Sequence, residues 1–243
     1  MKAEQTLTEL VQRLRKAAGS NLLSVVLYGS AASEEFHKGH SDLNVLAVMH
    51  DLGSADLNKL SEPVAWWTKQ GHPAPLFLTA GELHQAADIF AIEFVDIQAA
   101  HRLLHGEDVI TTLRVPMNLH RLQVERELRN NTLRLRQHYL RHPTDASKTL
   151  ELMTSSISTF TALFRHALIA LGRTPPLSKR VAIEDLAGLL GFDPTPFDQI
   201  LAIREGQKQP PEFDAQATFA SYLNQVAKVT EEVDRRLAPT VPQ

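Results

Sequence analysis

The sequence predicts an α+β fold in which a small mixed β-sheet domain with flanking helices is followed by an all-α helical bundle. Two observations carry this prediction. Short apolar and β-branched runs, separated by turns and helical segments, occupy residues 1–114. From residue 115 to 243 the apolar residues instead recur every three or four positions, which is the period of a helix. We therefore expect two domains, 1–114 and 115–243.

The first domain is predicted to alternate helices with strands. Leu10 and Leu14 lie on the apolar side of the first helix, and Gly19 ends it. Ser54 is the expected N-cap of the second helix, which Pro63 either kinks or shortens. The predicted elements are a helix over 4–18, strands over 23–28 and 42–49, a helix over 54–70, a strand over 76–79, a short helix capped by Thr79, and a strand over 90–97, or this strand followed by 98–104.

The second domain is predicted to be a bundle of about five helices. Its strongest periodicity lies in 147–171, where Met153, Ile157, Phe160 and Phe164 recur every three or four residues. Glycines, prolines and capping residues separate the segments. The predicted helices cover 118–141, 147–171, 178–190, 193–205 and 214–237.

Composition narrows the classes of function. Lys and Arg number 25 and Asp and Glu number 28, so the net charge is −3, which argues against a broad nucleic-acid-binding surface. The chain has no cysteine, so disulfides and thiolate metal sites are excluded. We see neither a signal peptide nor an apolar run of about 18 residues that would span a membrane. We therefore expect a soluble, cytoplasmic protein.

Residues 25–48 carry the candidate site. Gly29 and Ser30 end the first strand, and after 11 further residues Asp42 opens the second. A glycine permits backbone conformations that a Cβ blocks, and the Ser30 hydroxyl with the following N–H groups can hold a phosphate. Two carboxylates at positions i and i+2 of a strand share one face and can hold Mg²⁺ on a nucleoside triphosphate. Asp42 supplies one of these carboxylates, whereas Asn44, at the second position, supplies an uncharged amide oxygen.

The spacing of Gly29-Ser30 and Asp42-x-Asn44 resembles the signature of the nucleotidyltransferase superfamily of DNA polymerase β type. It is most similar to the aminoglycoside and the minimal nucleotidyltransferases, which pair a small α/β catalytic domain with a C-terminal helical bundle. Residues 101–108 look like the strand and glycine turn near the end of that first domain. The resemblance implies a nucleoside triphosphate as substrate or ligand and Mg²⁺ as cofactor. Gly29, Ser30 and Asn44 are then the nucleotide-binding positions, and Asp42 and Asn44 the metal-binding ones.

The family pattern also includes a third carboxylate on a neighbouring strand, and here the sequence departs from it. Residues 75–79 match that strand and place Phe77 where the aminoglycoside enzymes have a glutamate. Glu93 and Asp96 of the predicted strand 90–97 are the alternatives. Because they are three apart on a strand, they face opposite ways and only one can serve. Glu93 lies nearer the middle and is the expected catalytic residue beside Asp42.

Further candidates lie outside this motif. Lys179 and Arg180 begin a bundle helix and are predicted to bind nucleotide, because a cation beside a cleft compensates phosphate charge. His37 and His40, in the loop before Asp42, can also meet a phosphate. The expected place for the ligand is a cleft between the two domains.

Three functions are consistent with this sequence. The first is a nucleotidyltransferase-fold protein with weakened or lost catalysis that binds a nucleotide or a partner. The second is an active, Mg²⁺-dependent enzyme that moves a nucleoside monophosphate from a nucleoside triphosphate to a hydroxyl of a small molecule or protein. The third is an antitoxin-like interaction protein that binds a helical toxin through the bundle, and a homodimer is an open alternative for all three.

Overall fold

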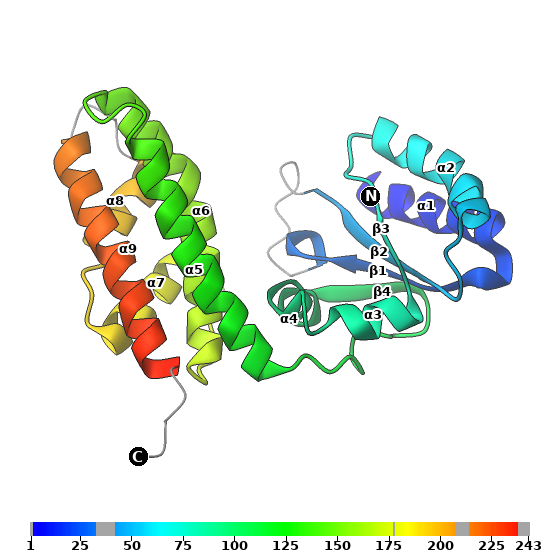
Figure 1. The fold of residues 1–243 in the computed structure, drawn as a ribbon. Helices are drawn as coiled ribbons and strands as arrows, with labels where there is room; N and C mark the ends of the chain where they lie inside the picture. The colour runs from blue at the N-terminus through cyan, green and yellow to red at the C-terminus, as the bar shows by residue number, and fades with distance from the viewer. Residues whose placement is uncertain (1, 33–41, 177, 208–213, 238–243) are drawn as a thin grey trace, which may run out of the picture. The chain divides into compact units, whose positions relative to one another are not determined.

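The computed structural model describes residues 2–32, 42–176, 178–207 and 214–237, which Figure 1 shows as a ribbon. The chain divides into two compact units, Met1–Pro116 and Met117–Gln243. The boundary follows Pro116, whereas the sequence placed it after residue 114. The first unit holds the sheet and the second is helical, so the predicted α+β fold class is confirmed.

The sheet of the first unit has four strands in the order β3-β2-β1-β4. They are β1 (Leu22–Tyr28), β2 (Asn44–Met49), β3 (Leu76–Thr79) and β4 (His101–Gly106). β1 is antiparallel to both β2 and β4, whereas β2 and β3 are parallel, so the sheet is mixed as predicted. In this topology the C-terminal end of β1 lies between the N-terminal ends of β2 and β4.

Two pairs of helices cover the two faces of the sheet (Figure 1). One face carries α1 (Lys2–Ala18) and α2 (Ser54–Lys69), and the other carries α3 (Ala80–Ala86) and α4 (Ala91–Ala99). Successive strand residues point to opposite faces. One core contains Val25, Leu27, Val45 and Ala47 together with α1 and α2, and the other contains Val26, Leu46 and Val48 together with α3 and α4.

The segment 90–106 corrects a prediction. Residues 91–99 form helix α4 instead of a strand, and the fourth strand is β4. Ala91, Phe94 and Ile97 are three residues apart and buried, which is the spacing of a helix side. β4 coincides with the strand that the family resemblance indicated at 101–108, and the turn that follows it uses Gly106 at φ +80°.

The first residues of two elements also differ from the prediction. β2 begins at Asn44, so Asp42 precedes the strand instead of opening it. Ser54 is the first residue of α2 and not its N-cap, and the helix continues through Pro63. The predicted Thr79 cap is confirmed, because its hydroxyl accepts the N–H of Glu82 at 3.1 Å.

The described residues of the second unit form five helices, as the periodicity predicted. Its apolar core runs along α6, where Met153, Ile157, Phe160 and Phe164 are buried. The helices are α5 (Met117–Tyr139), α6 (Ala146–Ala170), α7 (Lys179–Leu190), α8 (Thr195–Arg204) and α9 (Ala215–Leu237).

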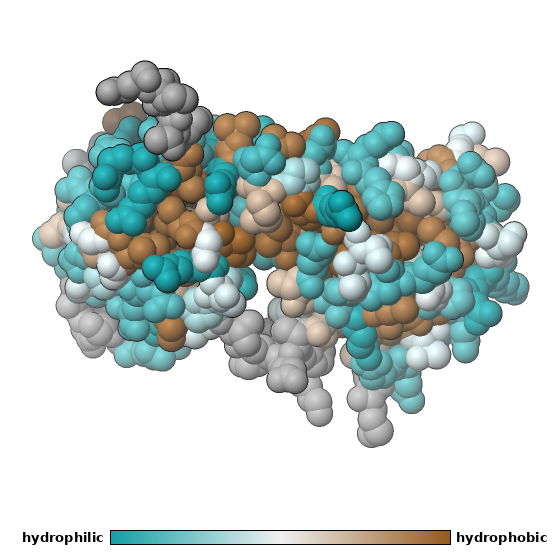
Figure 2. All heavy atoms as spheres, turned by 90° about the horizontal axis from the view of Figure 1, so that it is seen from below, coloured by the Kyte–Doolittle hydropathy of each residue, from teal (hydrophilic) through white to brown (hydrophobic). Residues whose placement is uncertain are grey.

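The surface mixes hydrophilic and hydrophobic residues. Figure 2 shows brown apolar groups between teal polar ones on the face that it presents. Exposed apolar side chains include Ile89 and Phe90 between α3 and α4, Leu122 and Leu133 on α5, and Leu140 just after α5. Scattered apolar exposure of this kind is usual for proteins and identifies no docking surface by itself. Within the described ranges, no helix combines the length and the apolar character needed to cross a membrane.

Candidate functional site

A glycine turn follows β1 at the end of the sheet where the motif residues lie. Gly29 has φ +78°, a conformation that residues with a Cβ rarely adopt. Its N–H donates to the carbonyl of Ala100 at 2.9 Å, and its own carbonyl accepts the N–H of Ala32 at 2.9 Å. One 3₁₀ turn, Ser30–Ala32, follows and leaves Ser30 exposed. Backbone hydrogen bonds therefore fix the turn against the junction of α4 and β4.

Asn44 lies against this turn. In the β1–β2 ladder Tyr28 pairs with Asn44, one residue from Gly29. A Cβ added to Gly29 would lie 3.5 Å from Nδ2 of Asn44, so the amide packs next to the glycine backbone. Burial raises the pKa of the neighbouring Tyr28 hydroxyl. The structure thus brings together the Gly29 and Asn44 positions that the sequence proposed as nucleotide-binding.

Asp42 stands apart from the strand. Its residue is exposed and precedes β2 by two positions, with the buried Leu43 between them. Within the described part of the chain, Asp42 makes neither a hydrogen bond nor an ion pair. His37 and His40 lie outside the described residues.

β3 does not supply the third carboxylate on either face. Phe77 pairs with Ala47 and packs in the core under α1 and α2. Asn44 lies two residues before Leu46 on β2, so both side chains point to the other face of the sheet. On that face Leu46 pairs with Leu76 of β3. Phe77 therefore cannot stand in the place of a carboxylate beside Asn44, and the leucines on the correct face carry no charge.

Glu93 lies on helix α4 and not on a strand, which changes its relation to Asp96. Residues three apart on a helix share one side, so the prediction that the two acids face opposite ways on a strand was wrong. Glu93 is exposed in the first turn of α4, and Asp96 is half-buried one turn before Ala100. Since the Ala100 carbonyl meets Gly29, the last turn of α4 adjoins the glycine turn.

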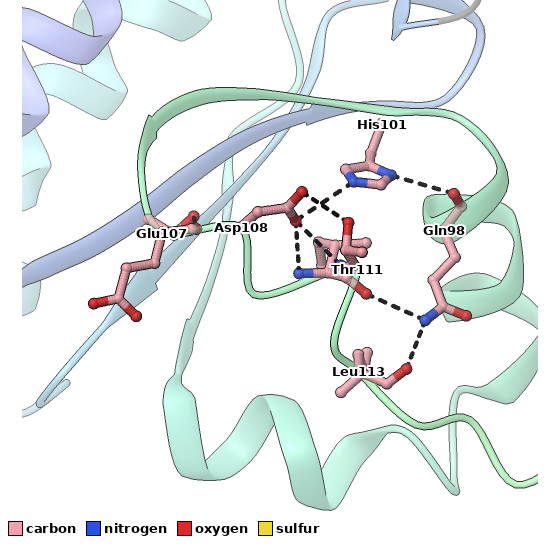
Figure 3. A network of polar contacts seen from close by, with 8 residues as sticks. Gln98, His101, Glu107, Asp108, Thr111 and Leu113 are labelled. Atoms are coloured by element: carbon pink, nitrogen blue, oxygen red, sulfur yellow. Dashed lines mark hydrogen bonds and ion pairs between the residues drawn. The ribbon is translucent and has the colours of Figure 1, made fainter.

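A polar network holds the junction between α4 and β4 (Figure 3). The Gln98 amide donates to the carbonyls of Ile110 and Leu113 at 3.2 and 2.6 Å. Nδ1 of His101 lies 3.2 Å from the Gln98 carbonyl, and its Nε2 lies 3.5 Å from Oδ1 of Asp108. These contacts position Ala100, and through it the glycine turn.

Asp108 is the anionic centre of that network. Its Oδ2 accepts the hydroxyl of Thr111 at 2.7 Å, and its Oδ1 accepts the N–H groups of Ile110 and Thr111 at 3.2 and 3.1 Å. The Thr111 hydroxyl, followed by the backbone donors and His101, holds the pKa of the Asp108 carboxyl below its usual range. Asp108 is therefore a structural anion at this junction.

His72 is a residue of this site that the sequence did not single out. Its ring packs against the buried indole of Trp67, with 4.4 Å between the ring centroids and a tilt of 36° between the ring planes. Burial lowers the pKa of His72, and the nearby Asp42 carboxylate partly opposes that shift. No local signal marks His72, because its neighbourhood depends on how β2 and β3 pair.

Lys179 and Arg180 belong to the second unit. Lys179 is the exposed first residue of α7. The Arg180 guanidinium pairs with Oδ1 of Asp198 at 3.3 Å and Oε2 of Glu205 at 2.7 Å, and these partners raise its pKa. Two acids of the same bundle thus offset the Arg180 charge.

The donors at the site do not fit a pair of Mg²⁺ ions. Across the described ranges, no three His, Asp or Glu side chains gather into a group that could hold a metal ion. Paired ions lie about 3.5–4 Å apart and need several carboxylates between them. The motif offers the single carboxylate of Asp42 and the neutral amide of Asn44.

Comparison with solved structures identifies the fold. The chain is similar to spectinomycin adenyltransferase AAD(9) from Enterococcus faecialis, in a crystal structure with ATP and spectinomycin. The TM-score is 0.58 at 15% identity, over 92% of this chain and 99% of that one. Neither a family model nor a curated protein matches the chain. The likeness shows a nucleotidyltransferase fold with a helical C-terminal region, which confirms the fold that the motif predicted.

Proposed function

We propose that this chain binds a nucleoside triphosphate at Gly29, Ser30, Asp42 and Asn44, and that its nucleotidyl transfer is weakened or lost. Support for binding comes from the fold, because its structural neighbour was crystallised with ATP. The observation that carries the loss of catalysis is the donor set. Asp42 is the motif's remaining carboxylate, since Asn44 is neutral and β3 is Leu-Phe-Leu-Thr.

The charge of this donor set limits the role of metal. Two Mg²⁺ ions bring four positive charges, and Asp42 offsets one of them. A single divalent cation, held by Asp42 and by the phosphates of the nucleotide itself, suits this charge better. Asn44 is neutral, so it contributes either its amide oxygen to that cation or its N–H to a phosphate.

Lys179 and Arg180 of the helical bundle remain candidates for contacting a phosphate. The Arg180 charge is offset by Asp198 and Glu205, which weakens its case. No ion pair engages Lys179 among the residues that the structure describes, and it is exposed. Of the two bundle cations, Lys179 is therefore the stronger candidate for contacting a phosphate.

The second candidate is active transfer of a nucleoside monophosphate to a hydroxyl. The acidic pair of α4 favours it, because Glu93 and Asp96 share one side of a helix whose end meets Gly29. Glu93 would accept the proton of the acceptor hydroxyl while that oxygen bonds to the α-phosphorus and pyrophosphate leaves. Spectinomycin is the first small-molecule acceptor to test, since the neighbour's structure contains it.

Calorimetry with ATP, with and without Mg²⁺, tests the binding proposal. We expect ATP to bind the wild type, and Asp42→Ala to weaken binding in the presence of Mg²⁺ by tenfold or more, or about 1.4 kcal/mol. Asp51→Ala is the matched control, because Asp51 is an exposed aspartate beyond the opposite end of β2. If ATP does not bind the wild type, or if Asp51→Ala weakens binding as much as Asp42→Ala, the proposed site is wrong.

Release of pyrophosphate from ATP separates the two candidates. A degenerate enzyme should release none with the wild type and should gain activity when Asn44→Asp restores the second carboxylate. Activity of the wild type with spectinomycin, lost in Glu93→Gln, would instead establish active transfer. Glu107→Gln, an exposed acid at the opposite end of β1, serves as the control for Glu93.

A further inference from the structure

A groove within the helical unit is lined by a cluster of basic side chains. It runs between the C-terminal part of α5 and the N-terminal part of α6, and two hollows of about 330 and 150 Å³ form it. Both hollows are lined by His138, Leu152 and Ser155, so they are continuous. The basic residues that line the groove are Arg134, His138, Arg141, His142 and Lys148.

Three of these residues lie on one side of α5 and of the turn that extends it. Arg134, His138 and Arg141 are four and three residues apart, which is the spacing of a helix side. The N–H of Arg141 donates to the carbonyl of His138 at 3.2 Å, so the chain keeps turning as far as Arg141. Seven residues of helix rise about 10 Å, so the two arginines are separated by that distance along the helix axis.

The protein does not offset the charge of these two arginines. Arg129 of the same helix pairs with Glu125 at 3.0 Å and with Asp234 at 2.7 Å. Within the described ranges, the guanidinium groups of Arg134 and Arg141 make neither an ion pair nor a hydrogen bond. A hollow lined by charges of one sign concentrates their field, and guanidinium groups match the oxygens of a phosphate.

The acid that lines the groove is Glu151, and it pairs with Lys148 at 2.8 Å. This contact offsets one of the basic side chains and leaves the two arginines unpaired. A small anion that enters the groove therefore meets attraction from Arg134 and Arg141 and repulsion from Glu151.

The rest of the groove offers uncharged polar groups. Asn131, Ser155 and Thr159 line it beside the apolar Leu135 and Leu152. Amide and hydroxyl groups can both donate and accept hydrogen bonds, which suits a ligand that carries hydroxyl groups. The larger hollow is at the lower end of the range of about 300–1,000 Å³ that is usual for small-molecule sites.

We propose that this groove binds a small hydroxylated bisphosphate, such as a sugar bisphosphate, with one phosphate at Arg134 and the other at Arg141. The site lies within the helical unit and is built from other residues than the proposed nucleotide site. The inference therefore goes beyond the proposed function and does not rest on it.

Calorimetry of the full chain with fructose 1,6-bisphosphate, at low ionic strength and without ATP, tests the site. We expect saturable binding to the wild type and about tenfold weaker binding to Arg134→Gln and to Arg141→Gln, because each change removes charge-assisted hydrogen bonds. Glu151→Gln should instead strengthen binding about threefold, because it removes the acid from the groove and leaves Lys148 free for a phosphate.

Arg121→Gln is the matched control, because Arg121 is an exposed arginine of α5 that does not line the groove. It should leave the affinity unchanged, and circular dichroism establishes that all four variants fold. A wild type that does not bind the bisphosphate, or equal weakening in Arg121→Gln, overturns the inference. Inorganic phosphate that binds as tightly as the bisphosphate also overturns it. Single-stranded RNA that binds more tightly, and loses affinity in the same variants, would assign the groove to nucleic acid instead.

Discussion

The two ends of the four-stranded sheet differ in how their polar groups are used. At the end where β1 begins, the fold satisfies them: the buried Ser24 hydroxyl donates to the carbonyl of Glu107 at 2.6 Å. The Asn21 amide donates to the Asp51 carbonyl at 2.9 Å and its oxygen accepts the Asp51 N–H at 2.8 Å. We call this end, where Ser24 and Asn21 form hydrogen bonds within the protein, the closed end of the sheet.

At the other end of the sheet, where β1 finishes, one charged side chain is not paired within the described ranges. Gly29 is anchored by its backbone, but Asp42 has no hydrogen-bonding or ionic partner within the described ranges. The His72 ring packs against Trp67, and burial lowers the pKa of His72. Polar groups that pair with each other stabilise a fold, whereas unpaired polar groups near a surface can bind a ligand. The contrast agrees with the proposal that the end with Gly29 and Asp42 binds the ligand.

The largest expected effect is at the closed end. Gly106→Ala forces a left-handed φ of +80° on alanine and places its Cβ 2.0 Å from the Leu23 carbonyl oxygen. Strain and backbone overlap together should lower the free energy of unfolding of the first unit by about 3 kcal/mol or more. Urea unfolding followed by tryptophan fluorescence measures this unit alone, since Trp66 and Trp67 are the two tryptophans of the chain. An unchanged midpoint would contradict this packing of β4 on β1.

Gly29→Ala should have a smaller effect on stability and a larger one on ligand binding. Its φ of +78° is equally unfavourable for alanine, but the added Cβ meets Asn44 at an ordinary 3.5 Å. We expect a loss of about 1–2 kcal/mol in the same urea experiment. Calorimetry should show weaker ATP binding to the folded variant.

Gly81→Ala is the control for both substitutions, because Gly81 lies in α3 without positive φ and its Cβ would approach nothing closer than 4.0 Å. Alanine there should stabilise the unit by about 0.5–1 kcal/mol. If Gly29→Ala and Gly106→Ala cost the same, the two ends of the sheet are equally packed and the comparison between them fails.

The smallest expected effect is on the pH dependence of the α4–β4 junction. The pKa of Asp108 is depressed in the folded chain, so its stabilisation is present above the ordinary aspartate value of about 3.9 and is lost as pH falls through the folded value. Asp108→Asn should therefore destabilise at pH 6 and flatten the loss of Tm between pH 5 and 3. Because the side chain is 39% exposed, we expect less than about 1 kcal/mol.

Thr111→Val removes the hydroxyl that contributes most to this shift. It should reproduce part of the flattening, measured by the same thermal unfolding at each pH. A Tm profile as steep as that of the wild type in both variants would show that the network of Figure 3 does not hold the charge of Asp108.

The glycine turn and the bundle helices were predictable because their signals are local. A left-handed turn at the end of a strand requires glycine, so Gly29 could be found from its position between two apolar runs. The five bundle helices followed from a spacing of three or four residues that extends over many turns. The segment 90–99 was mistaken for a strand because it is short and apolar, and a buried helix side and a strand look alike at that length.

By itself the sequence determined the fold class, a mixed sheet followed by helices, and it showed that the motif has the neutral Asn44 two residues after Asp42. The tertiary structure decided which faces and levels the side chains occupy. Phe77 turned away from Asn44, and Glu93 and Asp96 came onto one side of α4. The face that Phe77 occupies depends on the register of parallel strands joined through a helix, and a shift of one residue would exchange every face.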